Sequence, residues 1–249
     1  MDNRYTRNRL YITENEQKVI KNTPIILAGS GIGSNIAECA LRFGFENITI
    51  VDGDVVELSN LNRQNYTEGN ITEYKAVSLF NRLKAINSHA NIKFLSEFIT
   101  EENVERIIGN HKIAINALDF TSDMPLIFDK VCQEKGIHVL HPYNLGWGGL
   151  VTVITPNGLR LDSLSQNNDF NELKMVEYVS SYLRFWKKPN EWLENIIADY
   201  KNEKEFLPPP QLSIASWIVA GMCTHIMFNI SSKKDFKKFP EFYISSISD

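Results

Sequence analysis

Residues 25–45 constrain the fold of this chain more than any other stretch. An apolar run at residues 25–28 leads directly into Gly29, Gly31 and Gly33, and residues 35–45 then carry apolar side chains at helical spacing. This order predicts a strand, a tight turn and a helix. Glycines at alternate positions let backbone N–H groups approach an anion closely, and the positive end of a helix dipole attracts phosphate. Close packing alone also selects such turns, so the interpretation needs support from the surrounding residues.

A second apolar run supplies part of that support. Residues 47–54 are predicted to form a strand, and Asp52 near its end lies 19 positions after Gly33 (52 − 33 = 19). An acidic side chain at this distance from a glycine-rich turn suits the ribose hydroxyls of a nucleotide. Nucleotide binding is therefore the working hypothesis.

Composition excludes several classes of protein. The 249 residues are 43% hydrophobic and 22% charged, as in ordinary soluble globular proteins. A formal net charge of −4 gives no basic footprint, so we expect neither nucleic acid nor a membrane as partner. The polar first residues lack the apolar core of a signal peptide. We therefore expect a cytoplasmic location.

The cysteines and histidines give no pattern of metal ligands. Cys39, Cys132 and Cys223 are far apart in sequence and lie in apolar surroundings, so buried structural thiols are the favoured interpretation. The five histidines are scattered, and His138 and His141 are expected to flank a strand end. No zinc site is expected.

The remaining pattern alternates strands with helices. Strands are predicted at residues 92–99 and 112–119 and as a pair within 138–155, and helices at 14–22, 102–110 and 125–136. A further helix is expected to begin at Thr72 as its N-cap. This alternation predicts an α/β fold of Rossmann-like type, with a mainly parallel sheet covered by helices on both faces.

The last hundred residues no longer show the alternation of strands and helices. Residues 162–206 predict two or three helices, and the prolines at 208–210 end that region. The apolar segment 212–230 is expected to be a buried core helix, and the tail an edge strand. We divide the chain into an N-terminal arm (1–24), a nucleotide-binding part (25–160) and a C-terminal helical, substrate-specific part (161–249) packed on it as one compact unit.

Four polar residues are expected to meet at the carboxyl edge of the sheet. Asn60 and Arg63 lie in the loop after the second strand, Lys75 lies near a helix start, and Asp119 ends a strand. Two cations and an amide can hold the phosphates of a nucleoside triphosphate, and a carboxylate at a strand end can hold Mg²⁺. Each residue alone has an ordinary explanation as a solvated or capping side chain.

The order of these motifs resembles the ThiF/MoeB/HesA family, relatives of the ubiquitin-activating enzyme that adenylate a carboxylate. The resemblance runs from RYTR (residues 4–7) through the glycine-rich loop and VDGDVVELSNLNRQ (51–64) to the later Lys and Asp, and covers residues 4 to about 155. SNLNRQ, at its distance from Asp52, is its most specific part.

The resemblance implies an ATP-dependent enzyme that needs Mg²⁺. Its substrate would be the C-terminal carboxylate of a small ubiquitin-like protein or peptide, converted to an acyl-adenylate with release of pyrophosphate. It also implies a homodimer, because Arg7 matches an N-terminal arginine that reaches into the partner's site. The implied ligands are, for the ribose, Asp52; for the phosphates, Asn60, Arg63 and Lys75; and for magnesium, Asp119.

Several positions depart from the family pattern. Ala28 and Ser30 replace two glycines of the loop, and Phe120 and Met124 stand where the family often carries Asn and Arg. The paired CxxC zinc motifs are absent, and no cysteine occurs between residues 162 and 210, where relatives that form a thioester carry one. We therefore expect activation of a carboxylate without transfer to a thioester.

Two other functions remain open at this stage. A nicotinamide-dependent oxidoreductase would use the same glycine-rich turn and Asp52, but it would leave Asn60, Arg63 and Lys75 without a role. The altered glycine loop favours a catalytically silent, dimeric nucleotide-binding module.

Overall fold

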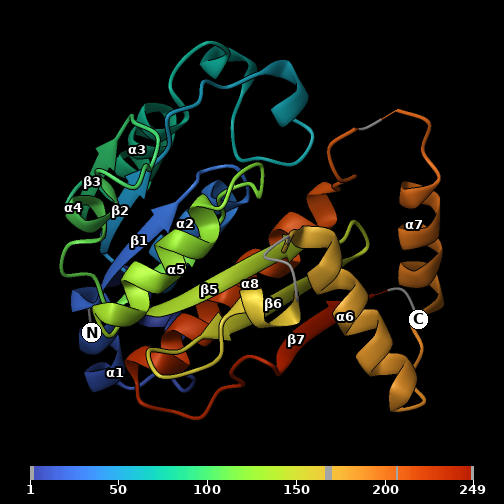
Figure 1. Cartoon of the computed structure of the whole chain (residues 1–249). Helices are drawn as coiled ribbons and strands as arrows, with labels where there is room; N and C mark the ends of the chain where they lie inside the picture. The colour runs from blue at the N-terminus through green and yellow to red at the C-terminus, as the bar shows by residue number, and fades with distance from the viewer. Residues whose placement is uncertain (1–2, 166–169, 206, 248–249) are drawn as a thin grey trace.

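A twisted sheet between two helical layers organises the computed structural model, which describes residues 3–165, 170–205 and 207–247 (Figure 1). The strand order is β3-β2-β1-β4-β5-β6-β7, with β3 to β5 parallel and β6 and β7 antiparallel to their neighbours. The strands are β1 (Pro24–Ala28), β2 (Asn47–Val51), β3 (Asn91–Leu95), β4 (Ile113–Asn116), β5 (His138–Asn144), β6 (Gly148–Ile154) and β7 (Phe242–Ser246).

Helices cover both faces of this sheet and enclose two apolar clusters. On one face lie α1 (Glu14–Asn22), α2 (Ile32–Phe43), α3 (Lys75–Ile86) and α8 (Ser213–Ser231). On the other lie α4 (Val104–Ile108), α5 (Met124–Glu134) and α6 (Glu172–Phe185), and α7 (Glu191–Lys201) packs against α6. Short 3-10 helices span Asn3–Asn8, Leu58–Asn60, Glu68–Asn70 and Leu161–Leu164.

The apolar pattern of each strand explains its place in the sheet. The central strand β1 is apolar along its length and is buried from Ile25 to Ala28, as expected for a strand covered on both faces. The edge strand β3 instead exposes Asn91, Lys93 and Phe94 and buries only Ile92. The α/β prediction is confirmed, including the two strands within 138–155, the helices α6 and α7, and the edge strand in the tail. The two strands within 138–155 are antiparallel to each other.

The prediction that Thr72 caps a helix is wrong. Thr72 has a left-handed backbone (φ 72°), and its N–H donates to the carbonyl of Val56 at 2.9 Å. Tyr74 pairs with Val55, and the Lys75 N–H donates to the carbonyl of Asp54 at 2.9 Å. Since residues 71–74 run back along residues 54–56, helix α3 begins only at Lys75.

Helix α8 is, among the described residues, the one helix long and apolar enough to cross a membrane. Half of that segment is buried, and it packs against α2, β5 and β6 as the predicted core helix. His138 lies at a strand end, as the first residue of β5, whereas His141 lies in the middle of the strand. The division at residues 24 and 160 stays a prediction, although α8 and β7 from the last part complete the sheet and its cover.

We predict that Gly29→Ala lowers the free energy of unfolding more than Gly136→Ala does. Gly29 has φ 91°, and a Cβ there would lie 2.4 Å from the carbonyl oxygen of Ala117, whereas a Cβ on Gly136 (φ 70°) would meet open space. Gly29→Ala should lower the free energy of unfolding by about 3 kcal/mol and Gly136→Ala by only about 1 kcal/mol. Urea denaturation measures both, and equal losses would contradict the close approach.

Candidate functional site

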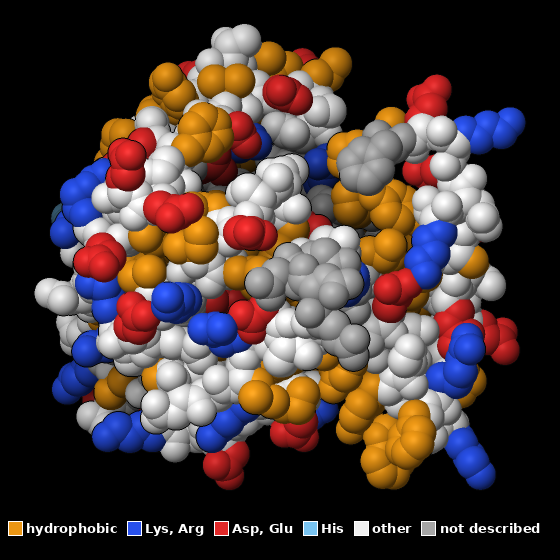
Figure 2. Space-filling view, in the orientation of Figure 1, with side chains coloured by type: hydrophobic (Ala, Val, Ile, Leu, Met, Phe, Trp, Pro, Cys, Tyr) orange, Lys and Arg blue, Asp and Glu red, His pale blue; other side chains and the backbone are white. Residues whose placement is uncertain are grey.

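The carboxyl edge of the parallel strands is the candidate site. Figure 2 shows the surface hollowed here, between the part of the molecule formed by residues 53–74 and the part that carries α7. Charged and hydrophobic side chains surround the hollow in that view. Ligands of open α/β sheets bind at this edge.

The glycine turn brings two strand ends into contact. Gly29 donates its N–H to the carbonyl of Val51 at 2.9 Å and leaves no room for a Cβ beside Ala117. Gly31 is the N-cap residue of α2, and a Cβ there would lie 3.3 Å from the amide nitrogen of Gln64. A Cβ at Gly33 would make an ordinary contact at 3.5 Å. The turn therefore needs glycine most at position 29.

Asp52 is fixed against the glycine turn. Its Oδ2 accepts hydrogen bonds from the Ser30 N–H at 2.6 Å and from the Ser30 hydroxyl at 2.9 Å, and its Oδ1 accepts from the Asp54 N–H at 2.8 Å. Ser30, which replaces a family glycine, thus fits the turn and adds a donor to the carboxylate. The position of Asp52, directly after β2, suits the predicted ribose contact.

The loop after β2 presents Arg63 and buries Asn60. The Asn60 side chain is 7% exposed, and its Oδ1 accepts from the Glu57 N–H at 3.0 Å. The Arg63 guanidinium donates to the Gln211 Oε1 at 2.6 Å and the Ser59 carbonyl at 2.7 Å. Asn60 therefore shapes the loop, and Arg63 is held where the loop meets the segment before α8.

Lys75 is the first residue of α3 and is 9% exposed. Its ammonium pairs with the Asp54 Oδ2 at 3.1 Å, so the buried charge is compensated. Asp54 itself is half exposed. Asp54 lies within the motif at residues 51–64, but the sequence did not predict its ion pair with Lys75.

Asp119 follows β4 and has an exposed carboxylate. The pKa of Asp119 lies above its ordinary value, mainly because the surrounding protein desolvates the carboxylate. The negative charges of Asp54 and Asp52 add to this rise, and the positive charges of Lys75 and Arg63 oppose it. Desolvation likewise lowers the pKa of Arg63, and Asp119 opposes this effect. Arg63, Lys75 and Asp119 therefore interact electrostatically at this edge, while their roles as ligands stay predictions.

Arg7 lies elsewhere. Its 3-10 helix is attached near the amino end of β2, where the Tyr5 hydroxyl donates to Glu46 at 2.8 Å and Asn8 donates to the carbonyl of Phe43 at 3.0 Å. The Arg7 side chain is exposed and has no hydrogen bond or ion pair within residues 3–165, 170–205 and 207–247. It therefore lies at the opposite edge of the sheet from the other candidate residues, and its delivery to a partner subunit stays a prediction.

Two residues that belong to the candidate site or support it, Gln64 and Glu38, were not identified from the sequence. Gln64, next to Arg63, lies against Gly31, and its buried Oε1 has no hydrogen-bond partner among the residues that the structure describes. A buried acceptor beside the turn indicates a place for a donor group of a ligand. Its position within SNLNRQ was the available signal.

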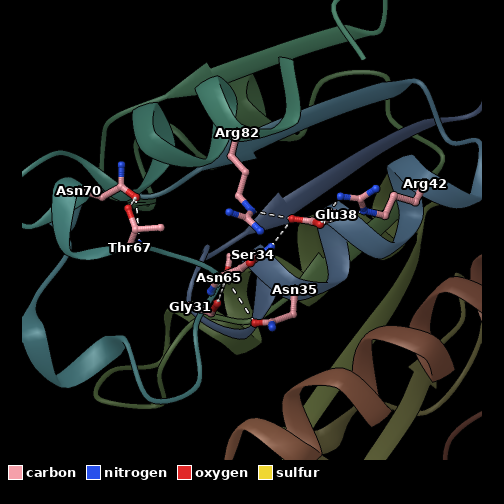
Figure 3. A network of polar contacts seen from close by, with 9 residues as sticks. All are labelled: Gly31, Ser34, Asn35, Glu38, Arg42, Asn65, Thr67, Asn70 and Arg82. Atoms are coloured by element: carbon pink, nitrogen blue, oxygen red, sulfur yellow. Dashed lines mark hydrogen bonds and ion pairs between the residues drawn. The ribbon is translucent and has the colours of Figure 1, made fainter. Parts of the chain in front are cut away.

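The second is Glu38, the centre of the polar network in Figure 3. This side chain, 5% exposed, accepts hydrogen bonds from Arg42 at 2.8 Å, Arg82 at 2.6 Å and Asn65 at 2.5 Å. The Asn65 N–H in turn donates to the Ser34 hydroxyl at 2.9 Å. Glu38 thus joins α2, α3 and the loop that carries Arg63.

Asp119 suits a magnesium ion that is bound partly by substrate and water, not a metal ion enclosed by protein ligands. Among the described residues, no group of three or more His, Cys, Asp and Glu side chains could hold a metal ion. In the same part of the chain the Asp119 carboxylate has no hydrogen bond or ion pair, so its oxygens are available. Mg²⁺ binds commonly through one or two carboxylates together with substrate phosphates and water.

The fold and this edge define an α/β protein of the nucleotide-binding class. The chain belongs to the ThiF family, whose sequence model matches residues 5–245. The sulfur carrier protein ThiS adenylyltransferase of Bacillus subtilis is 33% identical over 162 residues, which are 63% of this chain and 48% of that relative. The chain thus spans about half the length of that relative.

Two further comparisons agree with this assignment. The molybdopterin-synthase adenylyltransferase of Haemophilus influenzae is 27% identical over 165 residues, covering 65% of this chain and 68% of the relative. The crystal structure of E. coli MccB with AMPCPP and MccA aligns with a TM-score of 0.70 at 16% identity, covering 99% of this chain and 71% of MccB. At that identity, the structural likeness supports the fold.

We predict that Glu38 gives the protein a specific acid sensitivity. Burial alone would raise the pKa of Glu38, but hydrogen bonds from Arg82, Asn65 and Arg42 outweigh it and hold the pKa below its usual value. Because the folded-state pKa lies below the unfolded-state value, this stabilisation is complete at neutral pH and is lost as the pH falls below about 4 toward the folded-state pKa.

Glu38→Gln should lower the free energy of unfolding by about 2 kcal/mol at pH 7, and the difference from wild type should shrink in acid. Urea denaturation at both pH values measures it. Glu97→Gln, which breaks a more exposed ion pair with Arg106, is the matched control and should cost less. A difference that is the same at both pH values would contradict the role of the ionised Glu38.

Proposed function

We propose that this protein activates a carboxylate with ATP, forming an acyl-adenylate and releasing pyrophosphate. One observation carries the proposal: beside the glycine turn, Lys75 and Arg63 lie close enough to the Asp119 carboxylate that their charges lower its pKa and offset part of the effect of desolvation. Two cations beside a free carboxylate suit a triphosphate and its metal. Hydride transfer to a nicotinamide would not need two cations and a carboxylate that bind a triphosphate with its metal ion.

Each residue has a distinct part in this reaction. Asp52 would accept hydrogen bonds from the ribose, and Asn60, Arg63 and Lys75 would hold the phosphates as negative charge moves to the departing pyrophosphate. Asp119 would bind Mg²⁺, which when bound neutralises phosphate charge. The substrate carboxylate is already ionised at neutral pH, so in-line attack on the α-phosphorus needs no general base.

The substrate class follows from the relatives. The Bacillus subtilis relative is named for a sulfur carrier protein, and the MccB structure contains MccA. We therefore propose the C-terminal carboxylate of a small ubiquitin-like protein or peptide as substrate. Helices α6 and α7 would form the substrate-specific part, because they lie outside the region that carries the site motifs.

The proposed reaction ends at the adenylate. Burial raises the pKa of the thiols of Cys39, Cys132 and Cys223. A thiol with a raised pKa is protonated at neutral pH and is a poor nucleophile. We therefore propose that the acyl group does not pass to a cysteine of this chain.

The proposal includes a cytoplasmic homodimer. Since Arg7 lies at the far edge of its own sheet, it could serve a triphosphate only in the site of a second subunit. An arginine delivered in this way would stabilise charge on the phosphates in the transition state.

The first test of this function is substrate-dependent exchange of labelled pyrophosphate into ATP with Mg²⁺, using small carrier proteins ending in Gly-Gly and short peptides. Asp119→Ala and Lys75→Ala should each lower the exchange rate by about 100-fold or more. Asp235→Ala, at an exposed position remote from the site, is the matched control and should leave the rate unchanged.

Other outcomes would overturn the proposal. Absence of exchange with every candidate, together with a fluorescence response to NADH, would favour an oxidoreductase. Absence of binding to all nucleotides would favour a silent binding module.

The second test concerns delivery of Arg7 between subunits. Arg7→Ala and Asp119→Ala proteins should each be inactive, but a hybrid dimer contains one site with both residues intact. Mixing equal amounts and allowing subunits to exchange should restore about a quarter of the wild-type activity. If hybrid dimers form without recovery of activity, Arg7 does not act in the partner's site.

A further inference from the structure

Helices α6 and α7 form a hairpin inserted between β6 and α8, and both ends of this insertion are hydrogen-bonded to the candidate site. At its start, the Glu172 Oε1 accepts from the Phe120 N–H at 3.1 Å. After its end, the Gln211 Oε1 accepts from the Arg63 Nε–H at 2.6 Å. One contact adjoins Asp119 and the other holds Arg63 directly.

The first contact fixes the backbone after Asp119. The β4 ladder ends at Asn116, so regular sheet hydrogen bonds do not hold residues 118–120. The Phe120 ring packs edge-to-face on Phe170, 5.2 Å between centroids, in the segment that leads into α6. The position of the Asp119 carboxylate therefore depends on the start of α6, through Phe120 and Glu172.

The second contact fixes the Arg63 guanidinium. Of its three hydrogen-bond partners among the described residues, Ser59 and Asn62 belong to the same loop as Arg63, and Gln211 is the one from a distant segment. Gln211 follows three prolines, whose fixed φ angles make the segment stiff. Leu212 is hydrogen-bonded to Asn144 at the end of β5, at 2.8 and 3.3 Å, which anchors that segment.

We propose that Glu172 and Gln211 are positioning residues, through which the α6–α7 hairpin sets the places of Asp119 and Arg63 in the nucleotide site. The inference rests on the proposed function and adds a coupling to it. A substrate bound against the hairpin would then act on the same two residues that hold the metal and the phosphates. The alternative is that these two hydrogen bonds only attach the hairpin to the rest of the protein. They would then stabilise the fold without affecting nucleotide binding through Asp119 or Arg63.

Titration with the non-hydrolysable analogue α,β-methylene-ATP, with and without Mg²⁺, tests this inference without the acceptor substrate. Glu172→Ala should weaken binding by about 10-fold with Mg²⁺ and much less without it, because it acts through the metal-binding Asp119. Glu172→Gln keeps the acceptor for the Phe120 N–H and should restore binding. Gln211→Ala should weaken binding to a similar extent under both conditions.

Double variants separate positioning from stability. In an Asp119→Ala background, Glu172→Ala should add no further loss of affinity, and in an Arg63→Ala background neither should Gln211→Ala. Glu194→Gln, which breaks the Arg184–Glu194 ion pair inside the hairpin, is the control and should leave binding unchanged. Additive losses, or an unchanged response to Mg²⁺ in Glu172→Ala, would overturn the inference. Failure of the wild-type protein to bind the analogue would instead overturn the proposed function, and the inference with it.

Discussion

The approach of the Gly29 backbone to the carbonyl of Ala117 is the constraint on which the site depends. Strands β1 and β4 are paired up to Ala28 and Asn116, and Gly29, which lacks a Cβ, can pass close to the carbonyl of Ala117 just beyond them. A bulkier residue would separate the two strand ends. Ser30, the next residue, fixes Asp52 with two hydrogen bonds, so the shape of one turn positions the chain on both the β2 side and the β4 side of this edge.

The loop between β2 and α3 has little regular structure and owes its shape to polar contacts. The buried Tyr66 hydroxyl donates to the carbonyl of Ser30 at 2.8 Å, and Asn65 is held by Glu38 and Ser34. A loop of more than 20 residues in a compact domain is commonly functional. Here side-chain networks replace the backbone ladder that would hold a strand.

The sequence predicted those parts of the fold that depend on local pattern. Apolar runs mark the strands, and the rule that parallel strands end at one edge was enough to expect Arg63, Lys75 and Asp119 together. The capping rule failed at Thr72 because backbone hydrogen bonds to Val56 and Asp54 decide where α3 begins. The Arg63–Gln211 contact joins residues 148 positions apart, so no local pattern could indicate it.

The pair formed by Lys75 and Asp54 is unequal, since the lysine is nearly buried and the aspartate is half open to water. Asp54 therefore compensates the buried ammonium while its own carboxylate stays in contact with water. Under the proposed function, a phosphate that replaced Asp54 at the ammonium would displace this carboxylate only into solvent, so the buried charge would be compensated both with and without nucleotide.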